Sequence, residues 1–182
     1  MAMYIFQEVA PKVFYFTYCL QETDKFINFL EESESDETRK SIIQNWSNIE
    51  AGQKKIVSSD FSKEETRVDN RTRYIVNSLK ATLNYCFGQY KLYNRIEEDL
   101  IMDSDHIVVK SNSNALQETL SGKYKSMFFI NDEYEGGEIS VPNGKYSIKP
   151  EKGSILIAPS DTAISMNPIQ NGTQYVSFVS WH

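Results

Sequence analysis

The second half of the chain alternates short apolar or aromatic runs with turn-forming residues, a pattern typical of antiparallel β-sheets. The predicted strands cover residues 107–109, 125–130, 138–141, 146–148, 154–158 and 175–181. Turn-forming residues separate them at Glu135-Gly136-Gly137, Pro142-Asn143-Gly144, Lys152-Gly153 and Asn171-Gly172. Short strands that recur at steps of about ten residues predict an antiparallel sandwich or barrel.

Helical periodicity dominates the segment before these strands. Apolar side chains recur at steps of three and four residues and predict a helix over residues 71–96. Asp69 or Asn70 supplies its N-terminal cap, and Gly88 is a position where the helix ends or weakens. We expect the apolar stripe of this helix to pack against a sheet rather than to bind a ligand.

The N-terminal part of the chain is less regular. Two aromatic runs within residues 4–16 predict strands that begin a sheet. Residues 22–33 predict a short amphipathic helix, with Thr23 or Asp24 as its cap. Residues 39–69 are polar and weakly periodic, so we expect short pieces of helix or strand within loops.

Composition and net charge restrict the possible functions more than they restrict the possible folds. The 182 residues, 40% of them hydrophobic and 24% charged, are enough for one soluble domain with a substantial core. The net charge of −6 disfavours nucleic acid and anionic membranes as partners, because both bind clustered Lys and Arg. No run approaches the ~20 apolar residues of a membrane span. We therefore expect an intracellular protein with neither a nucleic-acid nor a membrane partner.

The two cysteines, Cys19 and Cys86, lie far apart in the sequence and belong to no CxxC or Cys/His motif. We expect two partly buried free thiols in a reducing compartment. A single long-range disulfide is the alternative.

The most specific sequence motif in the chain is FINDEYEGGE at residues 129–138, where a predicted strand ending in Asn-Asp leads into Tyr-Glu-Gly-Gly-Glu. The segments IKP, GSILIAPS and PIQNGTQY follow in that order, and Trp181 closes the pattern. From about residue 13 onward the chain resembles the prolyl hydroxylase-like branch of the 2-oxoglutarate/Fe(II)-dependent dioxygenases, and small phage-encoded members resemble it best.

This resemblance implies an α+β, mainly β fold: a double-stranded β-helix (jelly roll) with supporting N-terminal helices. We expect a single domain over residues 1–182. In it, residues 1–100 form the N-terminal strands and supporting helices, and residues 101–182 form the jelly-roll core. The expected location is cytoplasmic, or the virion if the chain is phage-encoded.

The resemblance also assigns positions to the family's metal ligands, which are a His-x-Asp pair and a distal His. The first His corresponds to Asn112 or Leu120, and its Asp partner to Asn114 or Gly122. The distal His corresponds to Ile164. None of these choices restores a His-x-Asp pair, and isoleucine cannot bind a metal, so we expect no metal site.

The cosubstrate positions differ as well. The family pairs the far carboxylate of 2-oxoglutarate with a basic residue on the last strand, and here that position is Gln174. Phe129 stands where the family often has a tyrosine hydroxyl. We therefore expect no cofactor-binding and no catalytic residues at these degenerate positions.

Two other features are candidate functional sites. The run from Asp103 to His106 contains metal-binding residue types, but it is more typical of a polar turn before a strand, and His182 is a weak candidate because it ends the chain. An acidic cluster invites a calcium or acid–base site, although a shaped turn between strands explains it more simply; its members are Asp132, Glu133, Glu135 and Glu138.

The leading prediction is a catalytically inactive dioxygenase-fold protein that acts as a protein-binding or structural component, for example of a virus particle, through a protein partner or self-assembly. The alternative is an active 2-oxoglutarate/Fe(II)-dependent oxygenase, a hydroxylase, with an atypical metal site. Fe(II) and 2-oxoglutarate are expected only under this alternative. A third possibility is a module that binds a small ligand in a largely apolar pocket lined by Leu120, Phe129, Ile164 and Gln174.

Overall fold

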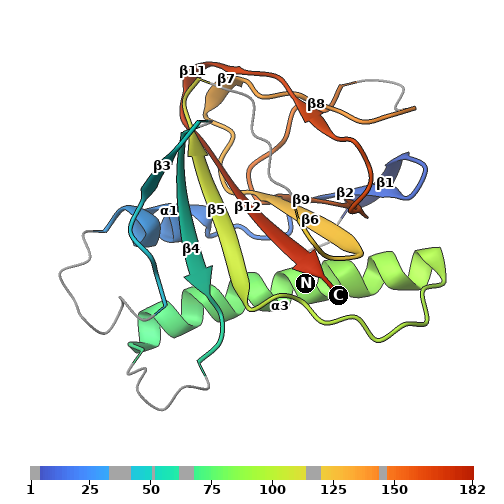
Figure 1. Cartoon of the computed structure of the whole chain (residues 1–182), viewed down its shortest axis with the longest axis horizontal. Helices are drawn as coiled ribbons and strands as arrows, with labels where there is room; N and C mark the ends of the chain where they lie inside the picture. The colour runs from blue at the N-terminus through green and yellow to red at the C-terminus, as the bar shows by residue number, and fades with distance from the viewer. Residues whose placement is uncertain (1–4, 33–41, 51, 62–67, 114–119, 144–146) are drawn as a thin grey trace.

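An eight-stranded antiparallel sheet crosses the molecule and separates a layer of helices from a set of short strands (Figure 1). The computed structural model describes residues 5–32, 42–50, 52–61, 68–113, 120–143 and 147–182. In Figure 1 the long helix α3 runs along one side of the sheet, and strands β7, β8 and β11 lie on the opposite side. No helix in these ranges is both long and apolar enough to cross a membrane.

The helices within the described ranges are α1 (Thr23–Glu31) and α3 (Asn70–Asn94). The strands of the large sheet are, in spatial order, β1 (Ile5–Ala10), β2 (Val13–Thr17), β9 (Ser154–Pro159), β6 (Tyr124–Phe129), β12 (Gln174–Trp181), β5 (Asp105–Ser111), β4 (Gly52–Ser58) and β3 (Ser47–Ile49). Two small sheets pair β10 (Ser165–Met166) with β8 (Ile139–Ser140) and β11 (Ile169–Gly172) with β7 (Tyr134–Gly136).

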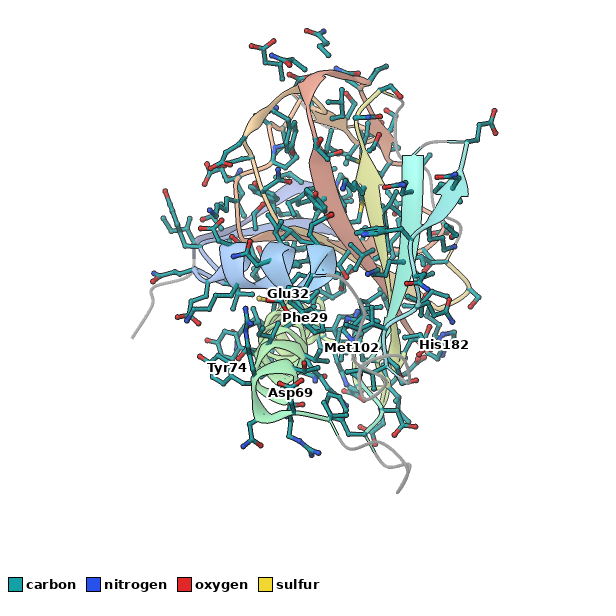
Figure 2. The ribbon with its side chains drawn as sticks, turned by 90° about the vertical axis from the view of Figure 1, so that its left-hand side faces the viewer. Phe29, Glu32, Asp69, Tyr74, Met102 and His182 are labelled. Atoms are coloured by element: carbon teal, nitrogen blue, oxygen red, sulfur yellow. The ribbon has the colours of Figure 1, made fainter. Side chains whose placement is uncertain are left out.

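Helices α1 and α3 cover one face of the large sheet and form the helix-side core with it. Phe26, Phe29 and Leu30 of α1 and Leu79 and Leu83 of α3 are buried there. Figure 2 shows Phe29 between the two helices, with Tyr74 on the outer side of α3. From the sheet, this core receives the side chains of Phe14, Phe16, Val108, Phe128, Ile155, Ile157, Tyr175, Val179 and Trp181.

The opposite face of the sheet lines a second core, the barrel-side core. The large sheet contributes Tyr15, Val109, Met127, Phe129, Leu156, Ala158, Val176 and Phe178 to it. The short strands close over these residues with Ile139 of β8 and Met166 of β10, and Val141 and Ile148 add to the cover. Successive side chains of a strand point to opposite faces, so each central strand supplies both cores.

The structure confirms most of the predicted elements. The two N-terminal strands, both helices and the main strands of the second half are present close to their predicted bounds. Residues 39–69 contain strands β3 and β4, which extend the large sheet beyond β5. The strand predicted at 146–148 falls partly outside the described residues, and Ile148 forms an isolated bridge with Ile139.

Some local predictions were wrong. Glu22, not Thr23 or Asp24, occupies the N-cap position of α1, and its side chain makes no capping hydrogen bond. Asp69 does cap α3, because its Oδ1 accepts from the Thr72 backbone N–H at 2.9 Å. Gly88 does not end α3. The helix continues to Asn94 and ends at Arg95, whose backbone is left-handed with φ 53°.

Two segments predicted as turns are strands instead. Tyr134–Gly136 forms β7, and Ile169–Gly172 forms β11, which pairs with β7. Gly136 adopts a positive φ of 81°, and a Cβ at this position would lie 2.2 Å from the backbone oxygen of Pro168. Gly136 therefore permits the close approach of two strands, which explains why its turn-like sequence misled the prediction.

Truncating a buried leucine of α3 should destabilise the protein far more than truncating an exposed leucine of the same helix. Leu83 is 0% exposed and Leu92 is 74% exposed, on the same helix. Leu83→Ala should lower the free energy of unfolding by roughly 3 kcal/mol because it leaves a cavity in the helix-side core. Leu92→Ala, the matched control, should change it by less than about 0.5 kcal/mol. Urea denaturation measures both, and equal effects would contradict the position of the helix.

Candidate functional site

The barrel-side core is the place where the family resemblance puts iron and cosubstrate. Phe129 lies at the end of β6, is fully buried and belongs to this core. Ile164 comes directly before β10 and Leu120 comes shortly before β6, and both pack against the same core. The structure therefore places three of the predicted positions in or against one core, and all three side chains are hydrocarbon.

The other predicted metal positions lie elsewhere. Gly122 lies against the last strand, and a Cβ added there would be 2.5 Å from the backbone oxygen of Trp181. Asn112 is exposed after β5, and Asn114 lies outside the described residues. Within the described ranges, the structure shows no common point faced by both members of either predicted pair, Asn112 with Asn114 or Leu120 with Gly122.

Gln174, the predicted cosubstrate position, is buried at the start of β12 and engaged with Tyr134. Its Nε2 donates to Tyr134 Oη at 2.8 Å. Burial raises the pKa of the Tyr134 phenol to about 12, so this hydroxyl stays neutral at physiological pH. Sequence reasoning missed Tyr134 as the partner of Gln174, and the residues gave no signal for it, because the two positions meet only through the fold.

Lys149 holds the other side of Tyr134. Its ammonium lies 4.0 Å from the centroid of the Tyr134 ring and donates to the backbone oxygen of Tyr134 at 3.0 Å. It also donates to the backbone oxygen of Gly136. A lysine that is committed to two carbonyl oxygens and an aromatic ring orders the β7 segment.

The Tyr15 hydroxyl, a second polar group in the barrel-side core, also has hydrogen-bond partners within the protein. Tyr15 Oη donates to Ser154 Oγ at 2.8 Å and accepts from the Glu151 backbone N–H at 2.8 Å. Ser154 Oγ donates in turn to the Glu151 backbone oxygen at 2.5 Å. These bonds fix the turn before β9 against β2.

His106 faces away from the barrel-side core. It lies two residues before Val108 on β5, so the two share a strand face, and Val108 belongs to the helix-side core. His106 is 0% exposed, and within the described ranges neither ring nitrogen has a hydrogen-bond partner. Burial, with a contribution from the charge of Lys80 on α3, lowers the pKa of His106 to about 4.

His182 is exposed at the end of the chain, beyond β12 (Figure 2). Its Nε2 lies 3.1 Å from a carboxylate oxygen of Asp103. His106 and His182 are the two histidines of the whole sequence. One faces the helix layer and the other ends the chain at the surface, so they do not converge on the barrel-side core.

The acidic cluster does not converge either. Asp132 Oδ2 accepts from the Lys152 backbone N–H at 3.1 Å, and Glu138 Oε2 accepts from Asn167 Nδ2 at 3.1 Å. Glu133 and Glu135 are exposed. Across the described ranges, no three His, Cys, Asp or Glu side chains are grouped to hold a metal ion. The cluster accordingly stabilises the turns around β7 and β8.

Comparison with solved protein structures identifies the fold. A viral collagen prolyl hydroxylase from Paramecium bursaria Chlorella virus-1, solved with 2-oxoglutarate, superposes with a TM-score of 0.58 over 98% of this chain and 94% of its own, at 13% identity. A 2OG-Fe(II) oxygenase family protein from Burkholderia pseudomallei superposes with a TM-score of 0.54 over 79% and 74%, at 11% identity. The chain has the fold of the 2-oxoglutarate/Fe(II)-dependent dioxygenases.

Sequence comparison reaches a shorter stretch of this dioxygenase-fold chain. A PKHD-type hydroxylase from Delftia acidovorans is 40% identical over 53 residues, which is 28% of this chain and 24% of that protein. The match thus covers about a quarter of the relative's length. No family model matches the chain.

The residues of this dioxygenase-fold chain do not fit the iron and cosubstrate of the family. Fe(II) with open coordination positions requires two histidines and a carboxylate on one face of the metal. Ile164 and Leu120 offer only hydrocarbon, and both histidines lie outside the barrel-side core. Gln174 carries no charge to pair with the far carboxylate of 2-oxoglutarate, and its amide N–H already donates to Tyr134.

The burial of His106 predicts a specific dependence of stability on pH. The unfolded chain takes up a proton at His106 with a pKa of 6.5, whereas the native protein resists it down to about 4. Stability at this site is therefore present above pH 6.5 and is lost as the pH falls toward 4, by roughly 3 kcal/mol in total. His106→Gln should remove this component from the free energy of unfolding measured by urea between these two pH values.

His182→Gln is the matched control, because it removes the exposed imidazole and should keep the pH dependence of the wild type. Carboxylates other than Asp103, which lies near both histidines, contribute the same background to all three proteins, so the difference between wild type and His106→Gln reports His106 and its interaction with Asp103. A His106→Gln protein that loses stability as steeply as the wild type would contradict the buried, neutral state of His106.

Proposed function

We propose that this chain is a catalytically inactive dioxygenase-fold protein that works by binding another protein or by assembling with itself. One observation carries the proposal: Leu120, Phe129 and Ile164, which the resemblance matches to the family's metal and cosubstrate positions, are hydrocarbon side chains that belong to the barrel-side core or pack against it. A hydrocarbon side chain at such a position offers no atom that can bind a metal ion. The fold persists because its stability rests on strand pairing and core packing, which the site does not supply.

The histidine count supports the same proposal independently of side-chain placement. A facial triad uses two histidines, and the whole sequence has His106 and His182 alone. For both to bind one metal, the buried face of β5 and the exposed chain end would have to converge.

The protein-binding part of the proposal rests on the outer face of α3. Tyr74, Tyr85 and Leu92 are exposed and are separated by eleven and seven residues, close to three and two turns of helix. They therefore lie along one side of α3, and Tyr74 is seen there in Figure 2. Exposed tyrosines supply much of the contact area of protein interfaces, while the acidic net charge of −6 disfavours nucleic acid.

An active hydroxylase with an atypical metal site is the second candidate, and the match to a PKHD-type hydroxylase at 40% identity over 53 residues favours it. This candidate requires a ligand set other than two histidines and a carboxylate at the family positions. The two candidates differ in one measurable property, which is the binding of metal and 2-oxoglutarate to the native protein.

Neither Mn(II), a redox-inert substitute for Fe(II), nor 2-oxoglutarate should raise the Tm of this protein, whether added singly or together. A ligand that binds the native state at about 100 times its Kd stabilises it by about 2.7 kcal/mol. For a chain of this size, that corresponds to a rise in Tm of roughly 5–10 °C. Thermal denaturation with each ligand alone and with both therefore tests the proposal.

The chlorella-virus prolyl hydroxylase, solved with 2-oxoglutarate, is the positive control. A rise in Tm that needs metal and 2-oxoglutarate together would overturn the inactive assignment. In that case His106→Gln and His182→Gln would show which imidazole the atypical site uses, because the variant that removes a ligand would lose the rise.

A further inference from the structure

The helix-side core brings the two cysteines of the sequence into contact. Cys19 lies between β2 and α1, and Cys86 lies within α3, 67 positions later. The Cys86 thiol donates to Cys19 Sγ at a sulfur–sulfur distance of 3.7 Å. Both are buried free thiols, with Cys86 0% and Cys19 7% exposed.

The backbone around Cys19 is held in place from two sides. Tyr18 adopts a left-handed φ of 57°, a bend that non-glycine residues seldom adopt. The backbone N–H groups of Cys19 and Leu20 donate to the oxygen of Gly153 at 3.1 and 3.3 Å. Gly153 is needed for this approach, because a Cβ there would lie 2.1 Å from the Leu20 oxygen. Cys19 therefore faces α3 from a segment tied to the turn before β9.

We propose that Cys19 and Cys86 form a reversible disulfide that cross-links α3 to the segment between β2 and α1. A disulfide holds its sulfurs about 2.05 Å apart, so the pair has to close from contact distance by side-chain rotation and a small shift of the segment. The bond stays open where thiol systems are reducing and closes in an oxidising environment. This inference is independent of whether the barrel-side core binds a cosubstrate.

The chemistry balances with a peroxide as oxidant. Hydrogen peroxide oxidises the Cys19 thiol to a sulfenic acid and leaves one water. The Cys86 sulfur then attacks the Cys19 sulfur, the S–O bond breaks, and the proton of Cys86 leaves with the hydroxyl as a second water. In total two thiols lose two electrons and two protons to the peroxide. Cys19 reacts first because it retains some exposure, whereas hydrogen bonding to Cys19 and burial raise the pKa of Cys86.

Closing the bond restricts the unfolded chain more than the native one. The 67-position span between the cysteines is long, and the entropy removed from the unfolded state grows with the length of the closed loop. The native protein already holds the sulfurs in contact, so little native freedom is lost. The oxidised protein is therefore the more stable form.

The test is oxidation of the purified full chain with hydrogen peroxide under native conditions. The expected product is a monomer whose intact mass is lower by two hydrogens, and a non-reducing digest should link the peptides that contain Cys19 and Cys86. Its Tm should exceed that of the reduced protein by on the order of 10 °C, and a dithiol reductant should reverse the rise.

Cys19→Ser and Cys86→Ser are the control variants, and each should abolish the oxidant-dependent rise in Tm whatever its own starting stability. If a buried serine prevents folding, titration of the wild type with reduced and oxidised glutathione supplies the second measurement, with a single two-electron midpoint expected. Disulfide-linked dimers, a glutathione adduct, or sulfinic acid without the internal link would overturn the proposal. An internal disulfide that leaves the Tm unchanged or lowers it would overturn the stabilising cross-link.

Discussion

The large sheet has to bury both of its faces, and β12 bears this constraint most fully. All of its residues from Gln174 to Trp181 are buried, and it forms hydrogen-bonded ladders with β5 and β6. Its odd-numbered positions, such as Val179, enter the helix-side core, while Val176 and Phe178 enter the barrel-side core. A slip of one residue would exchange these two sets. The helices on one side and the short strands on the other are both required to cover this strand.

The same constraint explains the chemistry of the barrel-side core. A buried polar group is costly unless it is hydrogen-bonded, and a metal-binding site inside a barrel is a set of polar groups that only a bound ligand satisfies. Here Ile164 and Leu120, both half-buried, pack hydrocarbon against this core, and Gln174 is satisfied by Tyr134. An interior that needs no ligand gains stability from its own packing, whereas an active site usually gives some of it up.

Much of the fold could be predicted because its signals are local. The 3.6-residue period of α3 and the apolar and aromatic run of β12 can be read from consecutive residues. Strands β7, β10 and β11 were missed because they have two to four residues and exist only through partners distant in sequence. The sequence predicts that His106 and Val108 lie on the same side of β5, because they are two residues apart. Which side of the sheet that is could be known only once the position of α3 was known.

The candidate site, like the fold, could be predicted only in part. Its positions could be assigned from a family resemblance, but the contacts that decide their chemistry, such as Gln174 with Tyr134, are set by tertiary structure. The titratable and oxidisable side chains His106, Cys19 and Cys86 all lie between the sheet and the helices, on the side of the sheet opposite the barrel-side core. Groups buried between a helix and the sheet influence stability, because their protonation or oxidation alters the packing around them. The predicted pH dependence and the proposed disulfide would therefore both act through how firmly the helices hold the sheet.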